Sequence, residues 1–405
     1  MLDDFGQRIR DIILSEMDLS RELSDEEICD LIGSVVSREA RDRPMTIKDR
    51  AELERTIFNS LRKLDVLQEL VDDRDVTEIM VNGPNDIFYE KAGRIQRFKG
   101  HFSSEEKLED VIQQIVGRHN RVVNQASPIV DTRLSDGSRV NIVLNPISIG
   151  GSAVSIRKFP EHPMSMERLV EIEALSPEVA RLLQILTQAK YNIFISGGTG
   201  SGKTTFLNAL SQYIPDDERI ITIEDSAELQ LLGAKNIVRL ETRNANTDGV
   251  TPITIRDLIR TALRMRPDRI IVGECRGAEA LDMLQAMNTG HDGSLSTGHA
   301  NSPHDIISRI ETMVLQGQDF PLNAIRQQIA SGIDIIVQLG RLRDKSRRVL
   351  EISEVDGFMG GEIVLHTLYR FEETAVLDSG RIQGFLKKEG TLCHTDKLMA
   401  AGLSV

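Results

Sequence analysis

The stretch that decides the fold of the second half of the chain is 191–205, which reads YNIFISGGTGSGKTT. Its residues 197–204 fit the pattern G-x-x-x-x-G-K-[ST], in which glycines let backbone N–H groups turn inward around phosphates. The lysine supplies positive charge to the phosphate oxygens, and the final hydroxyl ligates Mg²⁺. We therefore predict an ATP site made of Gly197, Gly198, Thr199, Gly200, Ser201, Gly202, Lys203, Thr204 and Thr205.

The residues on either side of the glycines predict how this loop is held. Residues 191–196 are an apolar strand, and 205–213 are a helix whose N-terminus points at the phosphates. Beyond residue 165, helical and strand patterns alternate, which is typical of a mostly parallel sheet flanked by helices. The fold class is therefore α/β, with a P-loop domain over 166–405.

Two further apolar strands end in acidic residues, which a P-loop enzyme needs for its metal ion or attacking water. One is 269–274, which ends in Gly-Glu, and the other is 220–225, which ends in Glu-Asp. We expect Glu274 to be the leading catalytic carboxylate and Glu224 to assist it, and both join Thr204 as candidate metal ligands. Functional and solvated roles stay equally open for Asp225 and Glu228.

A polar, glycine-rich stretch over 289–301 carries two histidines. We expect His299 to hydrogen-bond a γ-phosphate or the attacking water, and His291 is the weaker candidate. A helix over 255–266 carries arginines four residues apart on one face. For this stripe, a solvated surface and a role near phosphate or at a subunit boundary both stay open; it consists of Arg256, Arg260 and Arg264.

The first part of the chain has a different pattern. Residues 1–70 predict a helical bundle, with a capping box at 24–27 and a third helix from about 49 to 70. Residues 72–158 predict an α+β domain of short strands with one helix near 104–118. Pro160 and Pro163 favour an extended linker over 159–165.

Composition excludes several classes of protein. The 405 residues carry 49 Lys and Arg against 62 Asp and Glu, a formal charge of −13, with 4% aromatics and no Trp. Direct nucleic-acid binding is disfavoured, because it needs basic surfaces and stacking platforms. Three distant cysteines without a CxxC pair argue against zinc, and Cys275 is expected to be a packed thiol. No signal peptide or membrane-length apolar run occurs, which predicts a cytoplasmic location.

Four sequence elements, taken in order, resemble the Walker A, Asp box, Walker B and His box of the type II/type IV secretion and pilus-assembly ATPases. They are the P-loop at 197–204, Ile223-Glu224-Asp225 with Glu228-Leu229, Gly273-Glu274-x-Arg276-Gly277-x-Glu279-Ala280, and Thr297-Gly298-His299-Ala300-Asn301. Upstream, the stretches 131–141 and 155–159 are similar to the CpaF-like branch, associated with tight-adherence (Flp) pili. The missing four-cysteine zinc module argues against the type II branch.

The resemblance implies a RecA-like fold for the P-loop domain and a homo-hexameric ATPase peripheral to the inner face of the cell membrane. Its partner would be an inner-membrane platform protein, and its cofactors would be ATP and Mg²⁺. The nucleotide would lie between the 72–160 domain and the C-terminal domain. Arg139 and Arg157 match positions where the family brings arginine to phosphate, in the same subunit or across the interface.

The leading hypothesis is thus an ATP-hydrolysing motor that powers pilus assembly or protein secretion. One alternative is a nucleotide-gated assembly scaffold with little hydrolysis, and another is a type IV secretion or conjugation ATPase. A nucleic-acid translocase ranks behind these because of the negative charge. GTP is disfavoured because no Asn-Lys-x-Asp motif occurs.

Overall fold

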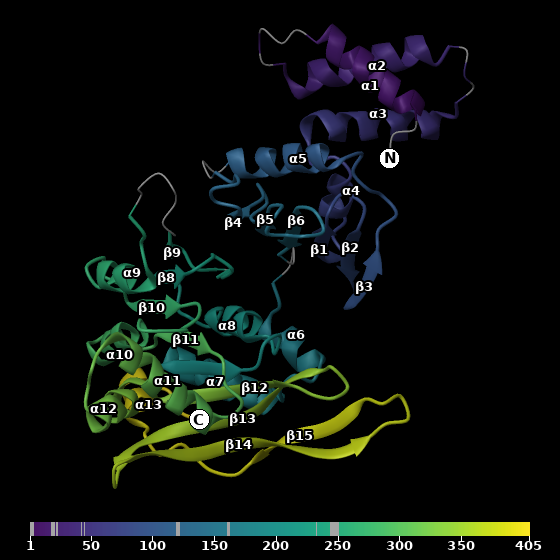
Figure 1. The fold of residues 1–405 in the computed structure, drawn as a ribbon. Coiled ribbons are helices and arrows are strands. Elements are labelled where there is room, and N and C mark those ends of the chain that lie inside the picture. Colours follow the sequence, from purple (N-terminus) through teal and green to yellow (C-terminus); the bar gives the residue numbers. More distant parts are fainter. Residues whose placement is uncertain are drawn as a thin grey trace. The chain divides into compact units, whose positions relative to one another are not determined.

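The computed structural model describes residues 4–17, 21, 23–41, 43, 45–118, 122–159, 163–231, 233–243 and 251–405. The chain divides into two compact units, Met1–Glu161 and His162–Val405 (Figure 1). Of the expected linker over 159–165, residues 160–162 lie outside the described residues. None of the helices in the described part of the chain combines the length and hydropathy of a membrane span.

Three helices open the first unit: α1 (Asp4–Glu16), α2 (Asp25–Glu39) and α3 (Ile47–Arg62). They enclose a small aliphatic core of Ile9, Ile13, Ile28, Ile32, Val35, Val36 and Ile57. The predicted capping box is confirmed, because Ser24 Oγ accepts from the Glu27 N–H at 3.2 Å and Glu27 Oε2 accepts from the Ser24 N–H at 2.8 Å.

The third helix is shorter than predicted. α3 ends at Arg62, Asp65 takes a left-handed φ of 51°, and a separate helix α4 (Leu67–Asp72) follows. The prediction of one helix to residue 70 was wrong because the leucines beyond residue 62 serve another core. Leu64, Leu67 and Leu70 pack with the strands that follow, and not with the three-helix core.

These strands form a six-stranded sheet of described residues in the order β3-β2-β1-β6-β5-β4, in which all neighbours are antiparallel. Helix α5 (Glu105–Gly117) packs on it through Leu108, Ile112 and Ile115. The predicted strands and helix of this part are confirmed within a few residues. The strands are β1 (Val76–Asn82), β2 (Ile87–Lys91), β3 (Arg94–Arg97), β4 (Ile129–Arg133), β5 (Arg139–Val143) and β6 (Ala153–Arg157).

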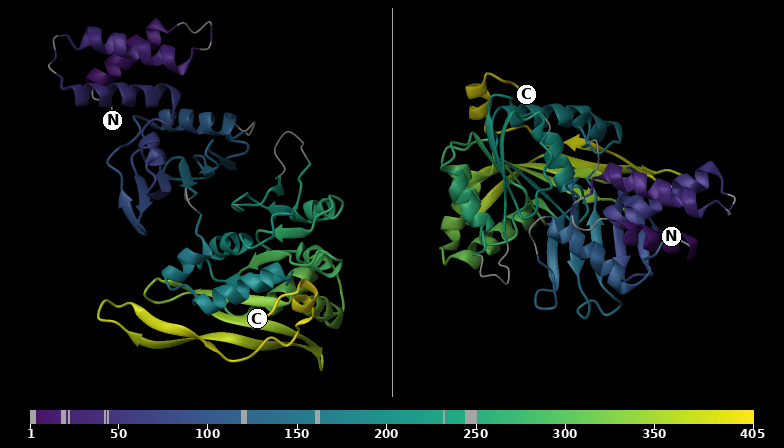
Figure 2. Two further views of the ribbon diagram at one scale, coloured as in Figure 1. Left: turned by 180° about the vertical axis from the view of Figure 1, so that it is seen from behind. Right: turned by 90° about the horizontal axis from the view of Figure 1, so that it is seen from above.

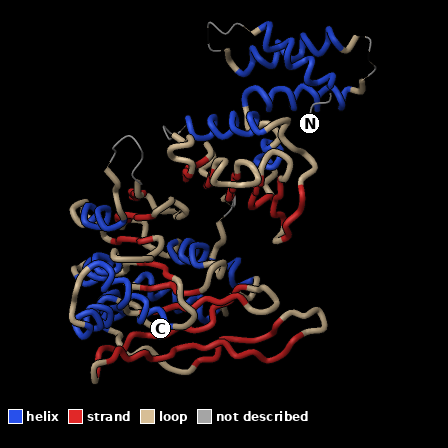
Figure 3. Tube along the Cα trace, in the orientation of Figure 1, coloured by secondary structure: helices blue, strands red, loops and turns tan. Residues whose placement is uncertain are grey.

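The described residues of the second unit form a nine-stranded sheet in the order β15-β14-β13-β12-β7-β11-β10-β8-β9. The strands from β12 to β9 run parallel, which confirms the predicted α/β class, and three long antiparallel strands extend the sheet beyond β12 (Figure 3). Their bounds are β7 (Ile193–Gly197), β8 (Arg219–Glu224), β9 (Asn236–Glu241), β10 (Arg269–Val272), β11 (Leu295–Gly298), β12 (Ile335–Arg341), β13 (Arg347–Met359), β14 (Glu362–Val376) and β15 (Ile382–Lys388).

Helices cover both faces of this sheet, and each face has its own hydrophobic core (Figure 2). Strand β7 supplies Ile193 and Ile195 to one core and Phe194 to the other, as the alternation of side chains along a strand requires. One face carries α6 (Met166–Glu171), α7 (Pro177–Gln188), α8 (Lys203–Ser211) and α13 (Asp396–Ala401). The other carries α9 (Ile255–Ala262), α10 (Ala280–Asn288), α11 (Pro303–Gly317) and α12 (Leu322–Gly332).

Candidate nucleotide site

The phosphate loop connects the buried strand β7 to helix α8 and depends on glycine at three points. Gly200 and Gly202 have φ of 72° and 96°, in the left-handed region that favours glycine. A Cβ atom on Gly197 would lie 2.5 Å from Ser201 Oγ and 2.7 Å from the Leu339 carbonyl oxygen. The loop is therefore folded tightly on itself, with no room for a side chain at Gly197.

The first turn of α8 offers a binding site for an anion. Gly202 occupies the N-cap position, and no side chain of the described residues caps the helix. The N–H groups of the first turn, which includes Thr204 and Thr205, are thus not satisfied by a cap, and the helix dipole adds partial positive charge. These donors fit the phosphates of a nucleotide.

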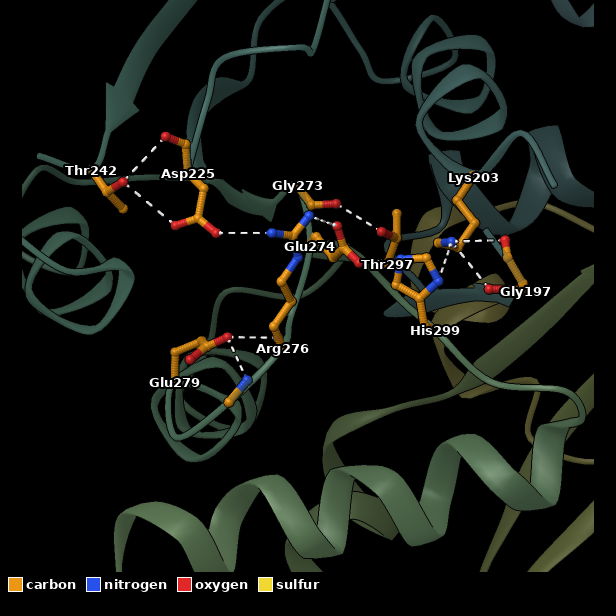
Figure 4. Close-up of polar contacts among 12 residues, drawn as sticks. Gly197, Lys203, Asp225, Thr242, Gly273, Glu274, Arg276, Glu279, Thr297 and His299 are labelled. Atoms are coloured by element: carbon orange, nitrogen blue, oxygen red, sulfur yellow. Dashed lines mark hydrogen bonds and ion pairs between the residues drawn. The ribbon is translucent and has the colours of Figure 1, made fainter. Parts of the chain in front are cut away.

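Lys203 lies at the centre of the site, with only 8% of its surface exposed. Its Nζ donates to the carbonyl oxygens of Gly197 at 3.1 Å and Gly198 at 3.2 Å, and lies 3.2 Å from His299 Nδ1 (Figure 4). Burial lowers the pKa of Lys203, because desolvation disfavours the charged form. The ammonium group is therefore held over the loop by neutral acceptors, which a phosphate can replace.

His299 follows β11 and lies between the lysine and a carboxylate. An ammonium group can only donate, so Nδ1 of the ring is the acceptor and Nε2 carries the proton. Nε2 lies 2.7 Å from Glu274 Oε1. Burial and the charge of Lys203 lower the pKa of His299, which keeps the ring neutral near pH 7. Direct action of His299 on a phosphate or water stays a prediction.

Glu274 follows β10 at the carboxyl edge of the sheet. Its Oε2 accepts from Arg276 at 2.6 Å, and the other end of that guanidinium lies 3.6 Å from Asp225 Oδ2. Thr297 fixes the neighbouring backbone, since its Oγ1 donates to the Gly273 carbonyl at 2.8 Å and its carbonyl accepts from the Cys275 N–H at 2.8 Å. His299 thus lies between the predicted Glu274 carboxylate and the Lys203 ammonium group, in contact with both.

Glu224 ends β8 and lies beside Gly273, the residue before Glu274. A Cβ atom on Gly273 would lie 2.8 Å from Glu224 Cγ, so the two strand ends touch. Glu224 Oε1 accepts the backbone N–H groups of Glu228 at 2.8 Å and Leu229 at 2.9 Å, and the residue is 4% exposed. Part of this carboxylate therefore holds the turn after β8, a structural role that the sequence did not predict.

The chemistry of the donors fits Mg²⁺, which prefers carboxylate and hydroxyl oxygens together with phosphate oxygens. Thr204, Glu224 and Glu274 supply such groups, and their roles as ligands stay predictions. The described residues contain no cluster of three or more His, Cys, Asp or Glu side chains that could hold a metal ion without a phosphate.

Arg139 and Arg157 belong to the first unit, where they are direct partners across β5 and β6. Arg157 Nε lies 3.9 Å from Glu78 Oε1, and 64% of the Arg157 side chain is exposed. The structure thus brings the two arginines together on one sheet. Their contact with a phosphate stays a prediction.

Contacts between two helices account for two of the three arginines of the basic stripe. Arg256 Nε and Arg260 Nε lie 2.8 and 3.0 Å from the two carboxylate oxygens of Asp282, whose side chain is 5% exposed. These ion pairs join α9 to α10, whereas Arg264 lies beyond the end of α9. His291 precedes β11 and His299 follows it, so the two histidines lie at opposite ends of the strand.

Two arginines at this site were given no role by sequence reasoning. Arg276 stands two residues after Glu274, and this short separation could have indicated that its side chain lies near the Glu274 carboxylate. Arg347 of β13 donates from Nε to the Gly200 carbonyl at 2.9 Å, across 147 positions of sequence. Cys275 is packed as expected: it is 1% exposed, and burial raises its pKa well above the usual range.

Comparison with known proteins agrees with this architecture. Residues 60–381 match the family model described as type II/IV secretion system protein. A putative conjugal transfer protein of Mycobacterium tuberculosis is 33% identical over 306 residues, which cover 74% of this chain and 86% of that protein. The conjugal transfer protein TrbB of Rhizobium radiobacter is 31% identical over 332 residues, 81% of this chain and 98% of its own.

Among solved structures, the ADP-bound pilus retraction motor PilT superposes with a TM-score of 0.52 at 22% identity, covering 75% of this chain and 81% of PilT. At this level of identity the likeness concerns the fold alone, and it supports the RecA-like assignment.

Proposed function

The chain belongs to the type II/IV secretion system protein family, and on this premise we propose that it is an ATP-hydrolysing motor for pilus assembly or protein secretion. One observation carries the proposal. A series of contacts runs from Lys203 Nζ to His299 Nδ1 at 3.2 Å, and from His299 Nε2 to Glu274 Oε1 at 2.7 Å. A lysine on a phosphate loop with a carboxylate close by is the arrangement that phosphoryl transfer to water uses.

In the proposed reaction, the N–H groups of 197–205 and the ammonium of Lys203 hold the β- and γ-phosphates. Lys203 would exchange the carbonyls of Gly197 and Gly198 for phosphate oxygens. Glu274 orients a water molecule and takes its proton as the water oxygen attacks the γ-phosphorus, and ADP leaves. Mg²⁺, held by Thr204 with Glu224 or Glu274, would neutralise phosphate charge.

The assembly around this site is also a proposal. We propose a homo-hexamer on the cytoplasmic face of the inner membrane, bound to a platform protein, with Arg139 and Arg157 adding charge at the phosphates. The proposed parts are a helical extension over 1–70, an α+β domain over 72–158, a linker over 159–165 and the motor domain over 166–405. Separate hydrophobic cores support a division into a helical and an α+β part, although Leu64, Leu67 and Leu70 pack in the α+β core.

Two uses of such a motor remain candidates. The similarity of 131–141 and 155–159 to the CpaF-like branch favours Flp pilus assembly. The relatives named for conjugal transfer favour a type IV secretion or conjugation motor.

The proposal is tested by phosphate release from Mg·ATP with the full chain and its Lys203→Ala variant. Removing the ammonium that faces the phosphates is expected to lower turnover by about 10²- to 10³-fold. The circular dichroism spectrum should stay unchanged. Lys48→Ala, an exposed lysine of α3, is the matched control and should turn over like wild type. Wild-type turnover in Lys203→Ala would refute the site.

A further inference from the structure

Arg276 connects the carboxylate of Glu274 to a second acidic strand end. One terminal nitrogen donates to Glu274 Oε2 at 2.6 Å, and the other lies 3.6 Å from Asp225 Oδ2. Asp225 Oδ1 in turn accepts from Thr242 Oγ1 at 3.4 Å, so the contacts reach the residue that follows β9 (Figure 4). The pair with Glu274 raises the pKa of Arg276, which stays charged.

The two oxygens of Glu274 have different surroundings. Oε1 lies 2.7 Å from His299 Nε2, and Oε2 accepts from Arg276. Glu274 Oε1 is buried and has no hydrogen-bond partner among the described residues, so the hydrogen bond from Arg276 is the contact that orients this carboxylate. Orientation of this kind matters for a base, because the water it serves must be in line with the phosphorus.

The ion pair between Arg276 and Asp225 contributes little to folding. The Arg276 side chain is 56% exposed and that of Asp225 is 47% exposed. Exposed ion pairs add little to the free energy of unfolding. Glu279 Oε1 nevertheless accepts the N–H groups of Arg276 at 2.6 Å and Gly277 at 2.8 Å, which fixes the turn that presents the guanidinium. Because the Arg276 side chain is held in place but adds little stability, we expect its main role to be the positioning of the Glu274 carboxylate.

We propose that Arg276 is a positioning residue for hydrolysis, and that Asp225 acts through it. Arg276 holds the Glu274 carboxylate in the orientation in which its free lone pairs face the attacking water. Asp225 holds the far end of the guanidinium, so it influences turnover without touching the nucleotide. The inference rests on the proposed function, because it requires that Glu274 act on water.

The test uses the full chain and measures kcat, KM for Mg·ATP, and the Kd of a non-hydrolysable ATP analogue. Arg276→Gln is expected to lower kcat about 10²-fold with KM and Kd unchanged, because misplacement of a reacting group costs about that much. Asp225→Asn should lower kcat by no more than about fivefold, because the free energy lost with one exposed ion pair corresponds to a change of about that size. Arg276→Lys, which keeps one contact with Glu274, should recover part of the loss.

The double variant distinguishes positioning from a general disturbance. If Asp225 acts only through Arg276, the Asp225→Asn change should have no further effect on kcat in the Arg276→Gln background. Arg370→Gln is the matched control, because Arg370 also bridges two carboxylates, Glu351 at 3.5 Å and Glu389 at 3.4 Å, with 53% of its side chain exposed. It should behave like wild type.

Three results would overturn the inference while the motor proposal stands: Arg276→Gln with the kcat of the Arg370→Gln control, Arg276→Gln with raised kcat, or multiplicative losses in the double variant. If Arg276→Gln does not fold, the kcat values of Asp225→Asn and Arg276→Lys test the inference instead. A wild-type kcat in both variants would overturn the inference. A wild-type chain that binds the analogue without hydrolysing ATP would refute both the motor and the inference.

Discussion

At the scale of single residues, the protonation of His299 decides how the site responds to pH. Its pKa lies below the ordinary 6.5 because the ring is partly buried and faces Lys203. The ring is therefore neutral above pH 6.5, and it gains a proton only as the pH falls further. A second positive charge would then lie beside the ammonium and remove the acceptor at Nδ1. We expect kcat to hold between about pH 7 and 8 and to fall on the acid side.

The control for this pH dependence is His299→Gln, which keeps a polar side chain that does not titrate. Its kcat should be lower than that of wild type, and the acid limb due to the ring should be absent from a pH profile of phosphate release. An unchanged acid limb in the variant would assign that limb to another group.

How far the site could be predicted depends on how local each contact is. The loop glycines and Lys203 are recognisable because their spacing alone makes the phosphate cradle, and Glu274 because it closely follows an apolar strand. The link from Arg347 to Gly200 was not predictable, since it joins the phosphate loop to a strand 147 positions away in the sequence. The use of Glu224 Oε1 by the turn after β8 depends on backbone direction, which residue type does not reveal.

At the scale of elements, Lys158 joins the end of β6 to the end of α4. Its Nζ donates to the carbonyl oxygens of Val71 at 2.7 Å and Asp73 at 2.6 Å. Charged hydrogen bonds of this kind are worth about 2 kcal/mol. Lys158→Met should therefore speed amide exchange in residues 67–73 by about 30-fold, measured by hydrogen–deuterium exchange of the full chain.

The comparison for Lys158 is Lys99→Met, which changes an exposed lysine of the same unit. Exchange in residues 67–73 should stay at the wild-type rate in that variant, and peptides from the second unit should be unaffected in both. Equal exchange in the two variants would contradict a helix-capping role for Lys158.

The elements themselves were largely predictable, because hydrophobic spacing of two or of three to four reports strands and helices directly. The exception is instructive. The leucines of 49–70 keep helical spacing throughout, yet Leu64 and Leu67 belong to the core of the sheet and not to that of the bundle. Which core a residue serves is a tertiary property, so the break near Asp65 is invisible in the spacing.

At the scale of the whole molecule, the proposed ring can be tested by mixing inactive subunits. Arg139→Ala chains keep Lys203, and Lys203→Ala chains keep Arg139. If Arg139 reaches the phosphate of a neighbouring subunit, mixed rings contain complete sites and phosphate release should recover. If it acts within its own subunit, the mixture should stay inactive. Arg157→Ala, at the paired position on β6, allows the same experiment.

The central claim is that ATP bound at 197–205 is hydrolysed with the help of Glu274, and one paired measurement tests it most directly. Nucleotide binding and phosphate release are measured on the same preparations of wild type and Glu274→Gln. We predict equal binding of Mg·ATP and a loss of release by about 10²- to 10⁴-fold in the variant, as expected when a general base is removed. Equal release from both proteins would contradict the claim.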